Sequence, residues 1–312
     1  MANVVTRPGW WISENSVTPE SVFRNRRQFL KELGFLGGAT LMARALEAAE
    51  AKKGYPYTRT KEYEVPNLKM SDENEAATWN NFYEFSTGKR QVHTLTGKFT
   101  IDPWKIEVGG LCEKPMAIDV KELIETMPME ERVYRFRCVE AWGMIVPWTG
   151  FELRKLIEKA QPKPEAKFVR FVTALKREEM PGVARLSEYP WPYTEGLRMD
   201  EAMHPLTLVA TGIYGKPLPK QHGAPVRIVV PWKYGYKSIK SIVKIEFVAT
   251  QPKTLWETLA PDEYPFESNV NPGVPHPRWS QATEWMLGDQ NTRVRTKLYN
   301  GYGEWVGKLY KA

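Results

Sequence analysis

Proline is so frequent in this chain that long helices are disfavoured over most of its length. The 312 residues include 24 prolines, and several lie close together, as in the pairs Pro162/Pro164 and Pro217/Pro219. Because proline lacks a backbone N–H and fixes φ, each pair interrupts a helix and stiffens a loop. We therefore expect short elements joined by rigid loops.

Short runs rich in β-branched residues lie between these loops and predict strands. The runs span residues 104–111, 132–139, 167–173, 206–211, 226–232 and 241–248. Two segments are helix-like: 119–127, where Asp119 is suited to the N-cap, and 151–160. The apolar side of the second consists of Phe151, Leu153, Leu156 and Ile157. No internal repeat divides this mixture, which predicts one α+β domain over 79–312.

The first 51 residues have the layout of an export signal. An apolar stretch at 33–42 follows the run NRRQFLK at 25–31, and Ala49-Glu50-Ala51 fits a small-residue cleavage site. The arginine pair resembles a twin-arginine motif, although Asn25 stands where Ser or Thr is more usual. The apolar stretch is too short to span a bilayer and has no polar face, which argues against a retained amphipathic helix. We expect a signal peptide over 1–51 and a periplasmic location.

The following stretch, residues 52–78, is rich in Lys, Glu, Tyr and Pro and shows no apolar periodicity. It predicts an extended arm that lies on the domain. The chain as a whole has 44 basic and 37 acidic residues, a formal charge of +7, with both signs interleaved. Without zinc-finger spacing, an RNP-like motif or a long basic block, this composition argues against a nucleic-acid partner.

The cysteine content limits the redox chemistry that this sequence can perform alone. Cys112 and Cys138 are its only cysteines. Two cysteines cannot form a disulfide framework, a four-cysteine zinc site or a cysteine-ligated iron–sulfur cluster, and no C-x-x-C-H haem motif is present. Redox activity would therefore need a bound cofactor and a separate source of electrons.

Cys138 lies in the run RVYRFRCVEAW at 132–142. In an extended chain, alternate residues face opposite sides. One side would carry Cys138, Glu140 and Trp142, and the other Arg135, Arg137 and Val139. A thiolate is a good ligand for soft or redox metals, and flanking arginines would help to lower its pKa. An isolated cysteine is more often a buried structural residue, so these residues alone leave both interpretations open.

This stretch resembles the molybdenum-ligand segment of the sulfite oxidase family. The likeness includes RFRCVEAW at 135–142, VPWTGF at 146–151, NNFYEF at 80–85, MHPLT at 203–207, APVRIVVPWKYG at 224–235 and the prolines and RWSQAT within 271–283. Within that family the chain resembles in particular the bacterial periplasmic reductases of methionine sulfoxide. The resemblance implies an α+β sulfite-oxidase-type domain with mixed sheets and a Mo-molybdopterin cofactor, whose metal Cys138 binds. Cys112 has no counterpart and is expected to be structural and free.

The resemblance also implies a set of cofactor contacts. Asn80, Tyr83 and Glu84 match residues that contact the pterin, whose ring edge offers several donors and acceptors. The other matching cofactor positions are Thr173, His222, Arg227, Ser238, Ile239 and Lys240. One relative in the family has Asn at the position of His222, and either side chain can donate a hydrogen bond to phosphate. Without the resemblance, the asparagines would indicate a turn and the cations a solvated surface.

The implied reaction is the two-electron reduction of methionine sulfoxide in periplasmic proteins. Glu140 and Asn81 would face the substrate side as catalytic residues beside Cys138. A membrane-embedded b-type haem partner would supply the electrons, and the chain would be a monomeric catalytic subunit without cytochrome or dimerisation domains. Two alternatives remain: a sulfite-oxidase-like enzyme acting on a small sulfur substrate, and an exported binding protein without catalytic activity.

Overall fold

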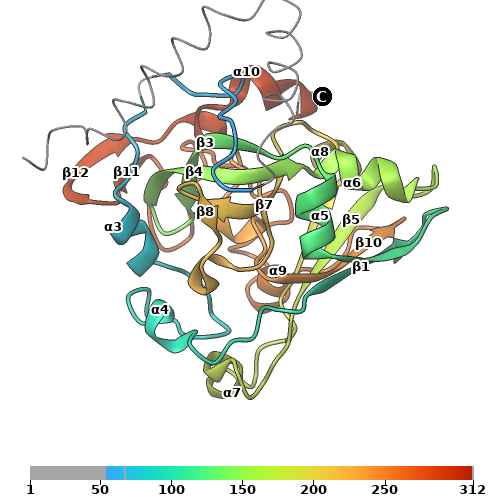
Figure 1. Cartoon of the computed structure of the whole chain (residues 1–312). Helices are drawn as coiled ribbons and strands as arrows, with labels where there is room; N and C mark the ends of the chain where they lie inside the picture. Colours follow the sequence, from blue (N-terminus) through green and yellow to red (C-terminus); the bar gives the residue numbers. More distant parts are fainter. Residues whose placement is uncertain (1–53, 67, 311–312) are drawn as a thin grey trace, which may run out of the picture. The chain divides into compact units, whose positions relative to one another are not determined.

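Two β-sheets contain most of the regular structure in the computed structural model, which describes residues 54–66 and 68–310 (Figure 1). The five-stranded sheet has the order β2-β1-β10-β5-β6. Its strands are β1 (Lys105–Gly110), β2 (Met116–Asp119), β5 (Phe168–Thr173), β6 (Thr194–Arg198) and β10 (Ile242–Val248). β1 and β10 run parallel while the other pairs are antiparallel, so the sheet is mixed as predicted.

The second sheet has seven strands in the order β12-β11-β4-β7-β8, with β3 paired to β4 and β9 to β7. The strands are β3 (Glu130–Cys138), β4 (Trp142–Glu152), β7 (Leu208–Ile213), β8 (Lys216–Pro217), β9 (Arg227–Val229), β11 (Thr283–Met286) and β12 (Asp289–Arg295). Nearly every residue of the β3–β4 hairpin is buried, since both of its faces are covered. This hairpin therefore forms the centre of the fold.

The helices are short, in agreement with the proline content. They are α3 (Glu73–Thr78), α4 (Val92–Leu95), α5 (Val120–Thr126), α6 (Leu153–Ala160), α7 (Pro181–Arg185), α8 (Met199–Ala202), α9 (Leu255–Leu259) and α10 (Gly303–Val306). Asp119 caps α5 as predicted, accepting a hydrogen bond from the backbone N–H of Lys121 at 2.8 Å. In the described ranges, the structure contains no helix that is both long and apolar enough to cross a membrane.

The longest strand, β4, is absent from the elements predicted from sequence. It contains Pro147 and two glycines, which are unfavourable in strands, and the predicted helix at 151–160 overlapped its end. Pairing with β3 and β7 stabilises it nonetheless. Gly150 lies at a register shift against β7, where an added Cβ would come within 2.0 Å of the Val209 carbonyl oxygen. The glycine is thus required by the close approach of the two strands.

The stretch predicted as an extended arm contains α3 in addition to irregular segments. The Asp72 side chain accepts hydrogen bonds from the backbone N–H groups of Asn74 and Glu75 and so caps this helix. Before it, the Tyr55 hydroxyl donates to the carbonyl oxygen of Thr211 at 2.7 Å, and Arg59 pairs with Glu131. The predicted signal peptide, residues 1–51, lies outside the described residues.

Buried cations distinguish the interior of this domain. The largest fully buried side chains include Arg137, Arg227 and Lys233 alongside aromatic residues such as Trp148 and Trp232. A charge inside a protein is costly unless it is paired or meets a ligand of opposite charge. The partners of these cations therefore indicate which of them support the structure and which belong to a binding site.

Candidate active site

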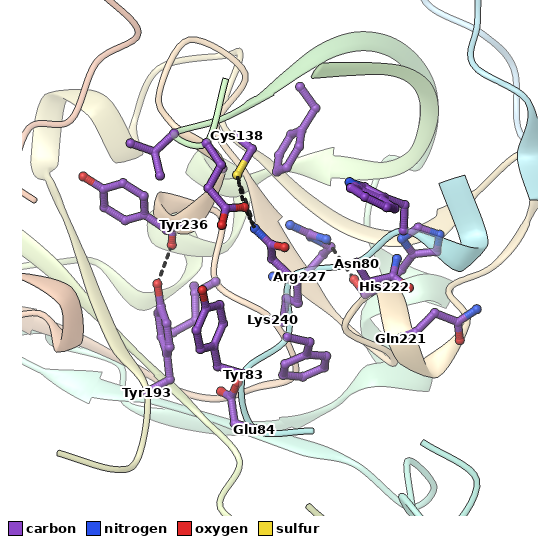
Figure 2. Close-up of a pocket in the computed structure, with 18 of the residues that line it drawn as sticks. Asn80, Tyr83, Glu84, Cys138, Tyr193, Gln221, His222, Arg227, Tyr236 and Lys240 are labelled. Atoms are coloured by element: carbon purple, nitrogen blue, oxygen red, sulfur yellow. Dashed lines mark hydrogen bonds between the residues drawn. The ribbon is translucent and has the colours of Figure 1, made fainter. Parts of the chain in front are cut away.

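Eleven of the twelve side chains expected at the site line a single cavity of about 900 Å³, measured to its open mouth (Figure 2). They are Asn80, Asn81, Tyr83, Glu84, Cys138, Glu140, Thr173, His222, Arg227, Ile239 and Lys240. The segments that carry them are far apart in sequence and meet between the two sheets.

A hairpin turn places Cys138 at the cavity wall. Cys138 ends β3 and pairs directly with Trp142, the first residue of β4, and Ala141 in the turn has a φ of 62°. The predicted extended run through Trp142 is therefore wrong, because the chain reverses after Cys138. Cross-strand partners share a face of the sheet, so Cys138 and Trp142 still lie together. Glu140 reaches back from the turn, and its Oε2 lies 3.5 Å from Cys138 Sγ.

The two flanking arginines lie on the opposite side of β3, as predicted, where both pair with the buried carboxylate of Glu284. Arg137 lowers the pKa of the Cys138 thiol, as expected, but stronger effects outweigh it. Burial, together with the nearby charge of Glu140, raises that pKa to about 12 despite the opposing charges of Lys89 and Arg137. The thiolate form would thus need a metal cation for stabilisation.

A compact polar cluster surrounds the sulfur. Asn81 Nδ2 donates to Cys138 Sγ at 3.2 Å and to Glu140 Oε2 at 3.0 Å, and Lys89 Nζ lies 2.8 Å from the same oxygen. Burial alone would raise the pKa of Glu140, but the hydrogen bonds from Lys89 and Asn81 outweigh it and hold the pKa below its ordinary value. The structure therefore presents an ionised carboxylate beside the thiol.

Another part of the cavity carries two cations that form no salt bridge within the described residues. Arg227 donates to the carbonyl oxygens of His222 and Ser238, both at 2.9 Å, and among residues 54–66 and 68–310 no ion pair involves Arg227 or Lys240. Burial lowers the pKa of Arg227 to about 9, which leaves it positive at neutral pH. Burial and these two cations lower the pKa of His222 to about 3, so its ring is neutral. The cluster is suited to an anion such as phosphate.

Backbone geometry holds this cation cluster together. Gly223 has a φ of 95°, and an added Cβ there would lie 2.6 Å from the Cβ of Lys240. The Thr173 hydroxyl donates to the Lys240 carbonyl oxygen at 2.8 Å. Ser238 is the expected contact that does not line the cavity: its Oγ accepts from the Val230 N–H at 3.0 Å, behind the wall. Its carbonyl instead fixes Arg227.

The remaining expected residues form a third part of the cavity, which fits a pterin. Asn80 Oδ1 is buried and has no hydrogen-bond partner among the described residues, although its Nδ2 donates to Ala76 O at 3.2 Å. Burial raises the pKa of Glu84 and lowers the pKa of Lys240. An unpartnered amide oxygen, an anion-binding cluster and a buried thiol thus meet in one cavity, as Figure 2 shows, and together they fit Mo-molybdopterin.

Sequence reasoning missed much of the cavity wall. The Tyr193 hydroxyl donates to the carbonyl oxygen of Tyr236 at 2.8 Å, and the ring of Trp256 lies 5.1 Å from that of Tyr83. The lining residues not predicted include Trp142, Tyr193, Gln221, Tyr236, Trp256 and Tyr264. Aromatic residues are as common in cores as in sites, so their type carried no signal. Lys89, which does not line the cavity but pairs with Glu140, was missed because a single lysine in a loop forms no pattern.

Comparison with known proteins agrees with this geometry. Residues 93–256 match the family model described as the oxidoreductase molybdopterin binding domain. The chain is 51% identical over 296 residues to the protein-methionine-sulfoxide reductase catalytic subunit MsrP of Campylobacter jejuni, covering 95% of this chain and 97% of that protein. Identity to MsrP of Burkholderia mallei is 46% over 311 residues, covering 96% and 93%.

Among solved structures, the sulfane dehydrogenase SoxCD of Paracoccus pantotrophus is similar over 60% of this chain and 56% of its own, with 19% identity and a TM-score of 0.41. A similarity of that size adds nothing to the assignment. The family model covers more than half of the chain, and both curated relatives are matched over nearly their whole length. The predicted family is confirmed: this chain belongs to the MsrP family of molybdopterin-binding oxidoreductases.

Proposed function

We propose that this chain is the catalytic subunit of an enzyme that reduces methionine sulfoxide in proteins. The observation that carries the proposal is one cavity in which a buried thiol, with Asn81 and Glu140 beside it, faces an anion-binding cluster around Arg227. Methionine sulfoxide in proteins is the substrate class in the names of the relatives from Campylobacter jejuni and Burkholderia mallei. Both are about half identical to this chain over nearly its whole length.

Each part of the cavity would hold one part of the cofactor. Cys138 would bind the metal, Arg227 and Lys240 the phosphate, and Asn80 and Glu84 the ring edge of the pterin. When bound, Mo-molybdopterin supplies two-electron redox chemistry at the metal. The protein contributes position, charge and exclusion of water around that centre.

The overall reaction converts a sulfoxide, two electrons and two protons into a thioether and water. Glu140 lies beside the thiol and would accept a hydrogen bond from the departing water, while Asn81 fixes its carboxylate by the 3.0 Å contact. The rings of Tyr83 and Trp256 form an aromatic wall at the same cavity. Such rings make favourable contacts with sulfur, so they suit the methionine side chain.

The electrons would come from a separate subunit, which we propose to be a membrane-embedded b-type haem protein. The sequence offers two cysteines and no C-x-x-C-H motif, hence no cysteine-ligated relay of its own. Both relatives are named as catalytic subunits, which is consistent with a partner. The arginine pair at 26–27 and the apolar stretch after it support export to the periplasm by the twin-arginine pathway.

Purified protein from a molybdenum-replete host tests this function. We expect about one molybdenum per chain, since Cys138 offers one thiolate. Methionine sulfoxide should be reduced with a reduced viologen as electron source and left unchanged with NADH or NADPH alone. Molybdenum-free protein without turnover would favour a binding protein, and oxidation of sulfite with no sulfoxide reduction would favour the sulfite-oxidase-like alternative.

A further inference from the structure

The carboxylate of Glu140 is held through only one of its oxygens. Oε2 receives Lys89 Nζ at 2.8 Å, Asn81 Nδ2 at 3.0 Å and Trp142 Nε1 at 3.5 Å. Within the described ranges 54–66 and 68–310, no hydrogen bond reaches Oε1. A carboxylate has acceptor sites on both oxygens, so Oε1 is available to a small molecule in the cavity.

Lys89 comes from a loop whose backbone is fixed. The carbonyl oxygen of Lys89 accepts a hydrogen bond from the N–H of Asn80 at 3.1 Å. Ser86 Oγ accepts from the N–H of Gly88 at 3.0 Å and donates to Gln91 Oε1 at 3.0 Å. The loop is thereby joined to the segment that carries Asn80 and Asn81, and Asn81 belongs to the polar cluster around the thiol. Lys89 thus reaches Glu140 from a rigid base.

Two adjacent cations in this loop have different contacts. The guanidinium of Arg90 lies 4.9 Å from the ring centroid of Trp79 and 3.7 Å from a carboxylate oxygen of Glu75. Lys89 instead pairs with Glu140, and both side chains are largely covered, with 21% and 30% of their area exposed. Only Lys89 therefore contacts the polar cluster around the thiol, and Arg90 provides a matched comparison.

We propose that Lys89 is a positioning residue of the active site, which holds Glu140 by Oε2 and thereby presents Oε1 to the reacting molecule. Its ammonium also offsets the negative charge of a carboxylate that lies 3.5 Å from the metal-binding sulfur. Without this cation, the carboxylate and an anionic thiolate would repel each other and Glu140 would turn away. We take the molecule at Oε1 to be the departing water, and this identification rests on the proposed function.

The experiment compares Lys89→Met, Lys89→Arg and Arg90→Met in the molybdenum-loaded enzyme. Loss of a residue that orients a group at a metal site lowers activity about tenfold or more, so we expect Lys89→Met to lower kcat by that factor. KM and molybdenum content should stay near the parent values. Lys89→Arg should restore most of kcat because it keeps the cation, and Arg90→Met should leave kcat and KM unchanged.

A double variant tests whether Lys89 acts through Glu140. In a Glu140→Gln background the further change Lys89→Met should have almost no effect on kcat, since coupled residues are not additive. The electron paramagnetic resonance spectrum of the Mo(V) state gives a readout that needs no turnover. Lys89→Met and Glu140→Gln should alter it in the same way, and Arg90→Met should not.

Three results would overturn the proposal: additive losses in the double variant, a rise in KM alone, or a Lys89→Met spectrum identical to that of the parent. The first two would show that Lys89 contacts substrate directly. If the parent enzyme fails to reduce methionine sulfoxide, the proposed function fails, while the spectra still decide the role of Lys89.

Discussion

Replacing Glu284 by Gln should destabilise the whole domain, although the side chain keeps its shape. Glu284 is fully buried on β11 and pairs with Arg135 and with Arg137, whose Nε lies 2.6 Å from Oε2. Thr296 Oγ1 donates to the same oxygen at 2.9 Å. The amide would leave two covered guanidinium groups without a counter-charge.

The size of the effect follows from this burial. Removing one partner of a buried ion pair costs about 3–5 kcal/mol, because the remaining charge stays desolvated. For a domain of this size, each kcal/mol lowers the midpoint of thermal unfolding by about 2 °C. We therefore expect Glu284→Gln to lower that midpoint by about 6–10 °C.

The assay is thermal or urea unfolding of parent and variant at equal molybdenum content. Glu158→Gln is the matched control, since it removes the same charge from an exposed pair in which Lys155 Nζ lies 3.8 Å from the carboxylate. Exposed pairs of this kind contribute at most about 1 kcal/mol. If Glu284→Gln unfolds with the same midpoint as Glu158→Gln, the buried pairing does not stabilise the domain and the reasoning is refuted.

The same substitution should loosen the hairpin that carries Cys138, the proposed metal ligand. Arg137 also donates to the Cys138 carbonyl oxygen and to Gln281 Oε1, and Gln281 Nε2 donates to Val139 O at 2.7 Å. Once Arg137 loses its carboxylate, these bonds to the backbone at 138–139 weaken. Hydrogen exchange in the turn after Cys138 should accelerate in Glu284→Gln and remain unchanged in the control.

Three further predictions concern the cofactor, acid stability and export. Cys138→Ala should lose molybdenum and activity while Cys112→Ala retains both, as metal analysis and a viologen assay would show. Burial and neighbouring cations lower the pKa of His222 to about 3, so below pH 6.5 the unfolded chain binds a proton that the folded chain does not. Because other groups titrate alike in both proteins, the stability of the cofactor-free parent relative to His222→Asn should fall by about 1.2 kcal/mol from pH 6 to 5 in unfolding titrations, and an unchanged difference would contradict this. Replacing Arg26 and Arg27 by Lys should retain the protein in the cytoplasm on fractionation, and normal export would contradict the twin-arginine interpretation.

Most strands were predicted correctly because their own residues, mainly β-branched ones, favour extended structure. Runs of β-branched residues became β1, β3, β5, β7, β9 and β10, and Asp119 capped its helix. The strand β4 could not be predicted in this way, because its proline and glycines are tolerated only through pairing with β3 and β7. Such pairing joins residues distant in sequence, so no window of the chain contains it.

The candidate site was likewise predicted only where a sequence motif marks its residues. Eleven of the twelve side chains that the family motifs predicted line one cavity. The twelfth, Ser238, lies behind the cavity wall. The reversal after Cys138 was missed, since its positive-φ residue is an alanine and not the glycine or asparagine that marks a turn. Lys89 and Tyr193 contribute by their position in space alone, and neither belongs to a recognisable spacing in the sequence.

The distribution of buried charge links folding, cofactor and export. Behind the hairpin, Arg135 and Arg137 of β3 share the carboxylate of Glu284, so that part of the core has its counter-charge within the polypeptide. Inside the cavity, Arg227 has only carbonyl partners and Cys138 is held as a neutral thiol. An anionic, metal-bearing cofactor would give Arg227 a counter-charge and would stabilise the thiolate of Cys138. Its binding free energy would then add to the stability of the folded state. A chain that reaches its most stable form only after cofactor insertion would benefit from an export route for folded proteins, the route proposed above from the arginine pair at 26–27.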